Sequence, residues 1–302
     1  MIRSFDELYS TLKAKGVRKR LIAAWAVDAH TIEAASMASS LGFVEVTLVG
    51  DADLIAKACA ELRVDPAGMR IVDIKDERKA VAEAVKMVHD GEGDVLMKGL
   101  CSTDKFVRAI LDKENGLLPP KGLLSHVGIL ESPNYHKLLF ASDVAVIPLP
   151  DLRQKAKIAG FLVEAARAFG VEKPKIAFIA ASEQMLDTMP ACMEAAMLSK
   201  MCDRAQIAGC IGDGPLALDV AVDKESAEIK KLCSPVAGDA DCLLFPNIES
   251  ANVFWKTNTK MIKGVRQSGM LVGTKVPCVL ASRADSVDVK LNSIAAAVAL
   301  VM

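Results

Sequence analysis

The sequence predicts an α/β fold of two lobes, in which mostly parallel sheets are covered by helices on both faces, an αβα sandwich. Short apolar runs of strand type alternate with helical patterns over much of the chain, which is typical of β-α-β units. The 302 residues suffice for two lobes, because single hydrophobic cores stop growing near roughly 250 to 300 residues. A composition of 52% hydrophobic and 25% charged residues indicates a packed globule.

The alternation is clearest in the first part of the chain. Continuous apolar runs predict buried strands, and apolar residues spaced three and four apart predict the helices between them. The predicted strands span 21–27, 44–49, 70–74 and 94–97, and the predicted helices span 31–41, 52–62, 77–89 and 103–111.

The rhythm breaks between Asn115 and Pro150, where prolines and glycines separate short β-like pieces. We predict that 126–130 and 137–140 are antiparallel additions at the junction of the lobes. Regular alternation then resumes, with helices over 153–169, 190–207 and 224–232 and strands over 175–180, 210–211 and 242–245. The predicted lobes are residues 1–140 plus 280–302, and residues 141–279, with the active cleft between them.

Polar residues follow two of the predicted strand ends. The run 242–245 leads into a helical pattern that carries Asn252, and the run 279–281 stops at Ser282 and Arg283 before another helix. Open α/β sheets bind ligands where strand ends lead into helix N-termini. A helix N-terminus beside a guanidinium favours phosphate. These two corners predict a site for a small anionic substrate.

Five segments of the chain closely resemble the phosphate acyltransferases that act on acyl-CoA, a family containing phosphate acetyltransferase and phosphate butyryltransferase. In their order and spacing, these segments cover nearly the whole chain. The sequences at 213–222 and 282–286 are more similar to the butyryl branch than to the acetyl branch. The segments are DVLMKG (94–99), MPACMEAAMLSKM (189–201), DGPLALDVAV (213–222), GDADCLLFPNIESANVFWK (238–256) and SRADS (282–286).

The resemblance implies a reversible transfer of an acyl group from short-chain acyl-CoA to inorganic phosphate, giving acyl phosphate and CoA. The fold would be isocitrate dehydrogenase-like. The implied partners are acyl-CoA, phosphate and acyl phosphate, and the chain would form a homo-oligomer, a dimer or higher. No cofactor is implied, since coenzyme A is a substrate and product.

The resemblance also implies catalytic roles for Ser282 and Arg283. Arg283 would hold phosphate with its guanidinium fork, and Ser282 would hydrogen-bond the thioester carbonyl or the leaving thiolate. The acetyl branch carries an aspartate seven residues after the serine, proposed as the base for the CoA thiol, and here that position is Val289. Asp288 is adjacent but turned by about 100° on a helix. Asp285, Asp288 and substrate assistance all stay open as the source of the base.

The remaining candidates are predicted to bind phosphate or CoA. Lys98 follows a buried strand and precedes a helix N-terminus, Ser125 and His126 lie in the junction region, and Asn252 and Lys256 follow a strand end. Each has a plain alternative. Lys98 would be a surface lysine beside a capped helix, His126 a structural hydrogen-bonder, and the last two part of a solvated helix face.

Composition and spacing exclude several classes of protein and partner. A net charge of -1 gives no electrostatic reason to expect nucleic acid or a membrane surface as a partner. The N-terminus lacks the apolar core of a signal peptide, and the longest apolar run, 294–302, is far short of the roughly 20 residues of a membrane span. We therefore expect a cytoplasmic protein, with 294–302 as a buried helix end.

Cysteine and histidine spacing shows no metal-binding pattern. The eight cysteines contain no CxxC pair and are predicted to be buried, reduced thiols. The four histidines lack HxxxH and HExxH spacing, so no protein metal site is expected.

Three alternatives to a butyryl-type acyltransferase stay open. The first is a phosphate acetyltransferase. The second is an NAD- and metal-dependent decarboxylating dehydrogenase with the same two-lobed layout, which would need clustered aspartates and an arginine-rich site that the sequence does not offer. The third is a non-catalytic CoA-binding relative, which the valine at position 289 keeps open.

Overall fold

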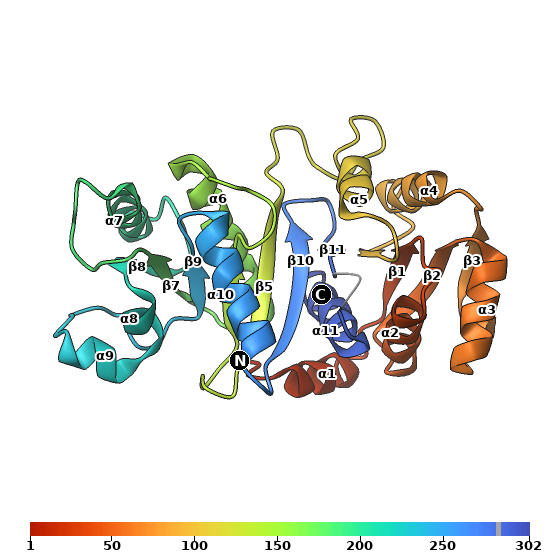
Figure 1. The fold of residues 1–302 in the computed structure, drawn as a ribbon, viewed down its shortest axis with the longest axis horizontal. Coiled ribbons are helices and arrows are strands. Elements are labelled where there is room, and N and C mark those ends of the chain that lie inside the picture. Colours follow the sequence, from red (N-terminus) through yellow and green to blue (C-terminus); the bar gives the residue numbers. More distant parts are fainter. Residues whose placement is uncertain (282–284) are drawn as a thin grey trace. The chain divides into compact units, whose positions relative to one another are not determined.

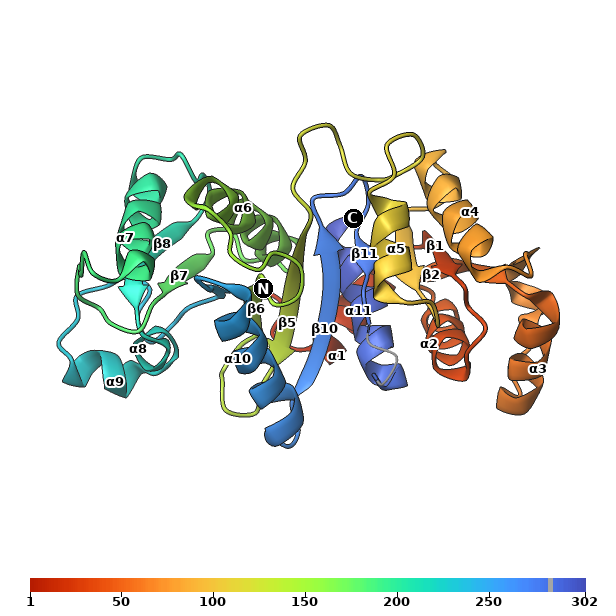
Figure 2. The ribbon, with the colours of Figure 1, turned by 45° about the horizontal axis from the view of Figure 1, so that its top comes forward.

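The computed structural model describes residues 1–281 and 285–302 and confirms the α/β class (Figures 1 and 2). The chain divides into two compact units, called here the outer-sequence unit (Phe5–Leu124 with Ser268–Met302) and the central-sequence unit (Met1–Ser4 with Ser125–Gln267). The divisions fall at 124/125 and 267/268, whereas the sequence placed them at 140/141 and 279/280. Strands β5 and β6, which follow residue 124, pair within the central-sequence unit, so the boundary lies before β5 and not after residue 140.

The outer-sequence unit contains a sheet in the order β3-β2-β1-β4-β11-β10. Its pairs are parallel except for β10 with β11. The strands are β1 (Lys19–Ala24), β2 (Val44–Gly50), β3 (Arg70–Asp73), β4 (Val95–Lys98), β10 (Arg266–Val272) and β11 (Cys278–Val279). Strand β10 belongs to this unit from Ser268 onward.

Helices cover both faces of this sheet. Figures 1 and 2 show α1, α2, α3 and α11 on one face and α4 and α5 on the other. The α-helices are α1 (Phe5–Ala14), α2 (Ala29–Ser40), α3 (Ala52–Leu62), α4 (Glu77–His89), α5 (Thr103–Ile110) and α11 (Val287–Leu300). Helix α11 is buried continuously from Lys290 to Ala299, which explains its small residues and confirms the predicted buried helix end for 294–299. The last residue, Met302, lies beyond the helix and is exposed.

The central-sequence unit contains a sheet in the order β5-β6-β9-β7-β8. Strands β5 and β6 pair antiparallel, as the sequence predicts for this region, and the other pairs are parallel. The strands are β5 (Ser125–Glu131), β6 (Leu139–Ser142), β7 (Lys175–Ile179), β8 (Ile211–Leu216) and β9 (Cys242–Leu244).

Helices also flank these five strands on both faces. Helices α6 and α7 lie on one face, and α8, α9 and α10 lie on the other (Figures 1 and 2). Their bounds are α6 (Leu152–Ala168), α7 (Pro190–Asp203), α8 (Leu218–Val222), α9 (Lys224–Ile229) and α10 (Ile248–Met261). No helix in the described ranges is long and apolar enough to cross a membrane.

Several helix starts are explained by side-chain caps. Ser102 and Ser286 accept hydrogen bonds from backbone N–H groups three residues later and begin α5 and α11, as their sequence positions predict. Strand β1 ends at Ala24 rather than at residue 27, because Trp25 adopts a left-handed φ of 54° that breaks the extended chain. Helix α2 accordingly starts at Ala29 and is capped by Asp28.

Candidate active site

Lys98 ends strand β4 in the outer-sequence unit and is only 1% exposed. Its ammonium donates a hydrogen bond to the Gly99 carbonyl at 3.2 Å. A Cβ on Gly99 would lie 2.4 Å from the Trp25 carbonyl oxygen, so only glycine lets the chain after β4 pass this close to the end of β1. The alternative of a surface lysine is therefore wrong. Lys98 is a buried cation at the carboxyl end of a parallel strand.

A second buried cation lies near the start of α2. Lys290 is 2% exposed, and burial lowers its pKa, although the carboxylates of Asp28 and Asp285 oppose that shift. Asp28 Oδ1 accepts from the Thr31 backbone N–H at 3.0 Å. Asp28 Oδ2 and Thr31 Oγ1 are buried and have no hydrogen-bond partner among the described residues. Buried polar atoms of this kind are uncommon and mark a place where a polar ligand can be bound.

Sequence reasoning missed Lys290. The available signal was a lysine that opens the long apolar face of α11, where a charge is costly unless it has a function.

The N-terminus of α11 carries the predicted base. Asp288 lies in the first turn and is exposed, whereas Val289 is half-buried and its backbone N–H donates to the Ser286 hydroxyl. Ser282 and Arg283 lie outside the described residues. The structure therefore confirms the helix that follows the Ser-Arg corner, and the roles of Ser282, Arg283 and Asp288 stay predictions.

In the central-sequence unit, Ser125 and His126 are joined by a residue that the sequence did not point to. The Asp143 carboxylate accepts from the Ser125 hydroxyl at 3.0 Å and from the His126 backbone N–H at 3.3 Å. It also accepts from the backbone N–H groups of Ala145 and Val146 at 2.8 and 2.9 Å. Asp143 is 3% exposed and follows β6, so these bonds fix the start of β5 to the end of β6. Only the pairing of the two strands reveals this contact.

The His126 imidazole is 5% exposed, and burial lowers its pKa although the Asp143 carboxylate opposes the shift. Burial therefore favours the neutral form of this imidazole. Its ring meets the Trp255 ring edge-on, with centroids 6.3 Å apart. His126 Nδ1 is buried and has no hydrogen-bond partner in the described part of the chain. This atom is therefore available to a polar ligand, and the role of His126 stays a prediction.

Helix α10 presents two different faces. Asn252 donates to the Val144 carbonyl at 2.9 Å, so Asn252 and Trp255 belong with the Ser125–Asp143 cluster. Lys256 is exposed and forms no ion pair with any residue that the structure describes. Of the two candidates on this helix, the structure brings Asn252 to the cluster and leaves Lys256 at the surface.

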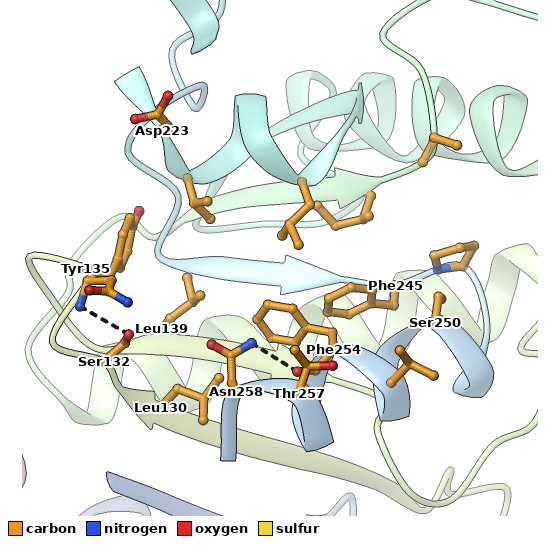
Figure 3. A pocket seen from close by; sticks show the side chains of 18 of the residues that line it. Leu130, Ser132, Tyr135, Leu139, Asp223, Phe245, Ser250, Phe254, Thr257 and Asn258 are labelled. Atoms are coloured by element: carbon orange, nitrogen blue, oxygen red, sulfur yellow. Dashed lines mark hydrogen bonds between the residues drawn. The ribbon is translucent and has the colours of Figure 1, made fainter. Parts of the chain in front are cut away.

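The opposite face of α10 lines an apolar groove of 730 Å³. Figure 3 shows Leu130, Leu139, Phe245 and Phe254 lining it from the sheet side and from α10. The two phenylalanine rings are tilted by 37° to each other, with their centroids 5.0 Å apart. Val253 contributes to the lining and is 66% exposed. This groove can take an apolar partner.

Buried cations and helix N-termini at the carboxyl ends of parallel strands define an α/β protein suited to small anionic ligands. The model of the phosphate acetyl/butaryl transferase family matches residues 77–298. The chain therefore belongs to this family, as the sequence motifs indicate. It is a phosphate acyltransferase of the phosphate butyryltransferase-like kind.

Individual relatives support this placement. The chain is similar to the phosphate butyryltransferase of Clostridium acetobutylicum, with 43% identity covering 98% of each chain. It is 40% identical to the phosphate acetyltransferase of Thermotoga maritima, over 93% of this chain and 95% of that one. A branched-chain phosphotransacylase from Enterococcus faecalis V583 superposes with a TM-score of 0.82 at 28% identity, covering 93% of this chain and 98% of that one.

A dehydrogenase shares only the fold. A putative 4-hydroxythreonine-4-phosphate dehydrogenase from Salmonella typhimurium superposes with a TM-score of 0.56 at 11% identity, over 94% of this chain and 100% of that one. This likeness accounts for the dehydrogenase-like layout that the sequence predicts, and it carries no activity with it.

Proposed function

We propose that the protein transfers the acyl group of a short-chain acyl-CoA, with butyryl-CoA preferred over acetyl-CoA, to inorganic phosphate. The observation that carries this proposal is the 43% identity to a phosphate butyryltransferase over 98% of both chains. A phosphate oxygen attacks the thioester carbonyl carbon, the C–S bond breaks, and the products are acyl phosphate and CoA. The reverse reaction uses the same groups, because both sides hold an activated acyl group.

In the outer-sequence unit, the proposed phosphate ligands are Arg283 and Lys98. The family resemblance supports Arg283, and the burial of the Lys98 ammonium beside Gly99 supports a strong interaction with an anion, since burial reduces screening by water. Ser282 is proposed to hydrogen-bond the oxyanion of the tetrahedral intermediate or the leaving thiolate. Asp288, exposed in the first turn of α11, is the proposed but dispensable base for the CoA thiol.

In the central-sequence unit, Ser125, His126 and Asn252 are proposed to bind the phosphate or CoA. The support is the unsatisfied Nδ1 of His126 and the hydrogen bonds by which Asp143 holds Ser125 and His126. A neutral imidazole can donate or accept a hydrogen bond, which suits a polar CoA or phosphate group. Lys256 is kept as an exposed cation for the phosphates of CoA.

We further propose that the protein is a homo-oligomer and that a second copy of the chain covers the groove beside α10. A groove of 730 Å³ with mostly apolar lining exposes Val253, and the exposed Met261 and Ile229 lie on α10 and α9. Large exposed apolar surfaces in soluble proteins mark association sites. The methionines Met193 and Met197 on α7 are also exposed rather than part of the core, which agrees with an interface. We also propose that the protein is located in the cytoplasm.

The decisive experiment measures thiol release from acyl-CoAs of two to six carbons in phosphate buffer. We expect kcat/KM to be highest for three to five carbons and roughly tenfold higher for butyryl-CoA than for acetyl-CoA, because each buried methylene contributes about 0.8 kcal/mol. A higher value for acetyl-CoA would assign the protein to the acetyl branch. Absence of phosphate-dependent release with every acyl-CoA would indicate a non-catalytic relative.

A further inference from the structure

Two cysteines far from the candidate site face each other where α7 leads into β8. Cys202 lies in the last turn of α7 and Cys210 directly precedes β8, and their sulfur atoms are 3.6 Å apart. Ala205 and Gly209 both have left-handed φ angles, 55° and 80°, which turn the chain back between them. Neither cysteine is in a disulfide, and the Cys210 thiol donates a hydrogen bond to Cys202 Sγ.

The surrounding residues make room for this approach. A Cβ on Gly212 would lie 2.4 Å from Cys202 Sγ and 2.8 Å from the Phe178 ring. No side chain other than the hydrogen of glycine fits there, so Gly212 lets the Cys202 thiol lie against the strand beside Cys210. The contact of the two sulfur atoms is thus set by the backbone on both sides.

The hydrogen bond between the two thiols and the cations near Cys210 make the two thiols unequal. A hydrogen bond with the Cys202 thiol lowers the pKa of Cys210, the cations Arg167 and Lys173 add to that shift, and burial opposes it. The same hydrogen bond raises the pKa of Cys202. The Arg167 guanidinium is held in place by donating to the carbonyls of Gly209 and Glu172 at 3.2 and 3.1 Å. The two cations lie near Cys210, so they favour its thiolate over that of Cys202.

Four of the other cysteines differ from this pair. Burial raises the pKa of Cys59, Cys242 and Cys278, which makes their thiols poor nucleophiles. Cys233 is exposed, but no other cysteine thiol lies within hydrogen-bonding distance of it in the described ranges.

We propose that Cys202 and Cys210 are a reversible oxidation site that forms an intramolecular disulfide with hydrogen peroxide as the oxidant. The Cys210 thiolate attacks one peroxide oxygen, the O–O bond breaks, and hydroxide leaves, which yields a sulfenic acid on Cys210. The Cys202 sulfur then attacks the Cys210 sulfur, the S–O bond breaks, and the Cys202 proton leaves with the hydroxyl as water. The two thiols lose two electrons in total and the peroxide gains them. An external dithiol reverses the step by thiol–disulfide exchange.

The test exposes the intact wild-type protein to a modest excess of hydrogen peroxide, blocks remaining thiols with iodoacetamide and digests it with trypsin without reductant. Cleavage after Lys200, Arg204 and Lys224 places the cysteines on the separate peptides 201–204 and 205–224. We expect these peptides to be joined, with a mass lower by two hydrogen atoms than their sum, and to separate after dithiothreitol. Recovery of both peptides alkylated, at a peroxide dose that oxidises the exposed Cys233, would overturn the proposal.

Two variants test the order of the steps. In Cys202→Ser, the sulfenic acid on Cys210 has no partner, so dimedone should label peptide 205–224. In Cys210→Ser, dimedone should not label peptide 201–204. Cys233→Ser is the matched control and should form the disulfide to the same extent as the wild type. Dimedone labelling of Cys202 in place of Cys210 would contradict the assigned roles.

Discussion

The Ser125 hydroxyl donates a hydrogen bond of 3.0 Å to the Asp143 carboxylate, and both residues are buried. The residues are 18 positions apart: Ser125 begins β5, and Asp143 directly follows β6, the antiparallel partner of β5. The same carboxylate accepts hydrogen bonds from the backbone N–H groups of His126, Ala145 and Val146, the last two in the loop after Asp143. Asp143 therefore positions two predicted ligand-binding residues without being predicted itself.

Replacing Asp143 with alanine should destabilise the protein, because several buried donors would lose their acceptor. We expect a loss of about 3 kcal/mol or more in the free energy of unfolding, measured by urea denaturation. The control is Asp223→Asn, which weakens the cap of a short surface helix and should cost no more than about 1 kcal/mol. An Asp143→Ala protein as stable as the control variant would show that the carboxylate does not hold this corner.

Replacing Arg283 with lysine should lower phosphate-dependent turnover about a hundredfold or more in a folded protein, because an ammonium cannot contact two phosphate oxygens as a guanidinium does. Steady-state rates with butyryl-CoA and phosphate measure the effect, and circular dichroism checks the fold. Turnover at the wild-type rate would remove Arg283 from the proposed phosphate site.

The base for the CoA thiol is tested by comparing Asp288→Asn with Ser282→Ala. A thiol with a pKa near 8.5 is already a few per cent thiolate at neutral pH, so a dedicated base is helpful but dispensable. Since Asp288 is exposed and turned about 100° from position 289, we expect Ser282→Ala to be the more damaging change. A loss of a thousandfold or more in Asp288→Asn, with loss of the pH response that deprotonates the thiol, would make Asp288 the base instead.

The buried Lys290 should make stability depend on pH in the alkaline range. Its pKa is lower in the folded protein than in the unfolded chain, so between these two values the unfolded chain binds the additional proton and stability rises with pH. Relative to Lys290→Met, the wild type should therefore gain stability as the pH rises toward the ordinary lysine pKa of 10.5, by at most about 1.4 kcal/mol per pH unit.

Urea denaturation at a series of pH values measures this difference. Lys256→Met, at an exposed lysine, is the control and should show no comparable trend. A constant difference between wild type and Lys290→Met across the range would mean that Lys290 is solvated in the folded protein.

Val253→Asp tests the proposed oligomer. The Val253 side chain is 66% exposed within one chain, so an aspartate there should leave the fold intact. At an interface over the groove, the new carboxylate would lose its water, which should weaken association. Light scattering should report a smaller assembly than the wild type, whereas Leu54→Asp, at an exposed apolar residue of α3, should leave the assembly unchanged. A monomeric wild type, or an unchanged assembly in Val253→Asp, would refute the proposed interface.

Much of the fold could be predicted because its signals are local. Helices α3 and α4 have the bounds that the periodicity of their apolar residues predicts, and the structure shows that Asp51 and Asp76 cap them. The antiparallel pair β5 and β6 followed from the break in the alternation. Helix α1 was not predicted, since its three buried residues, Phe5, Leu8 and Leu12, are too few to stand out in the sequence.

The candidate site was predicted only in part. The motifs around Lys98, His126 and Asn252 pointed to residues that the structure finds buried or hydrogen-bonded near strand ends. Asp143 and Lys290 escaped notice, because their roles depend on neighbours that are distant in the chain.

The sequence by itself determined the fold class, the family and most helix and strand positions of this protein, since these depend on periodicity, caps and motif wording within short windows. Only the tertiary structure decided which groups are buried together. Strands β1, β4 and β11 are adjacent although they are far apart in the chain, and their order places the buried Lys98 against the end of β1. Removal from water gives a cation or imidazole its altered pKa, and burial is a property of the packed fold rather than of local sequence.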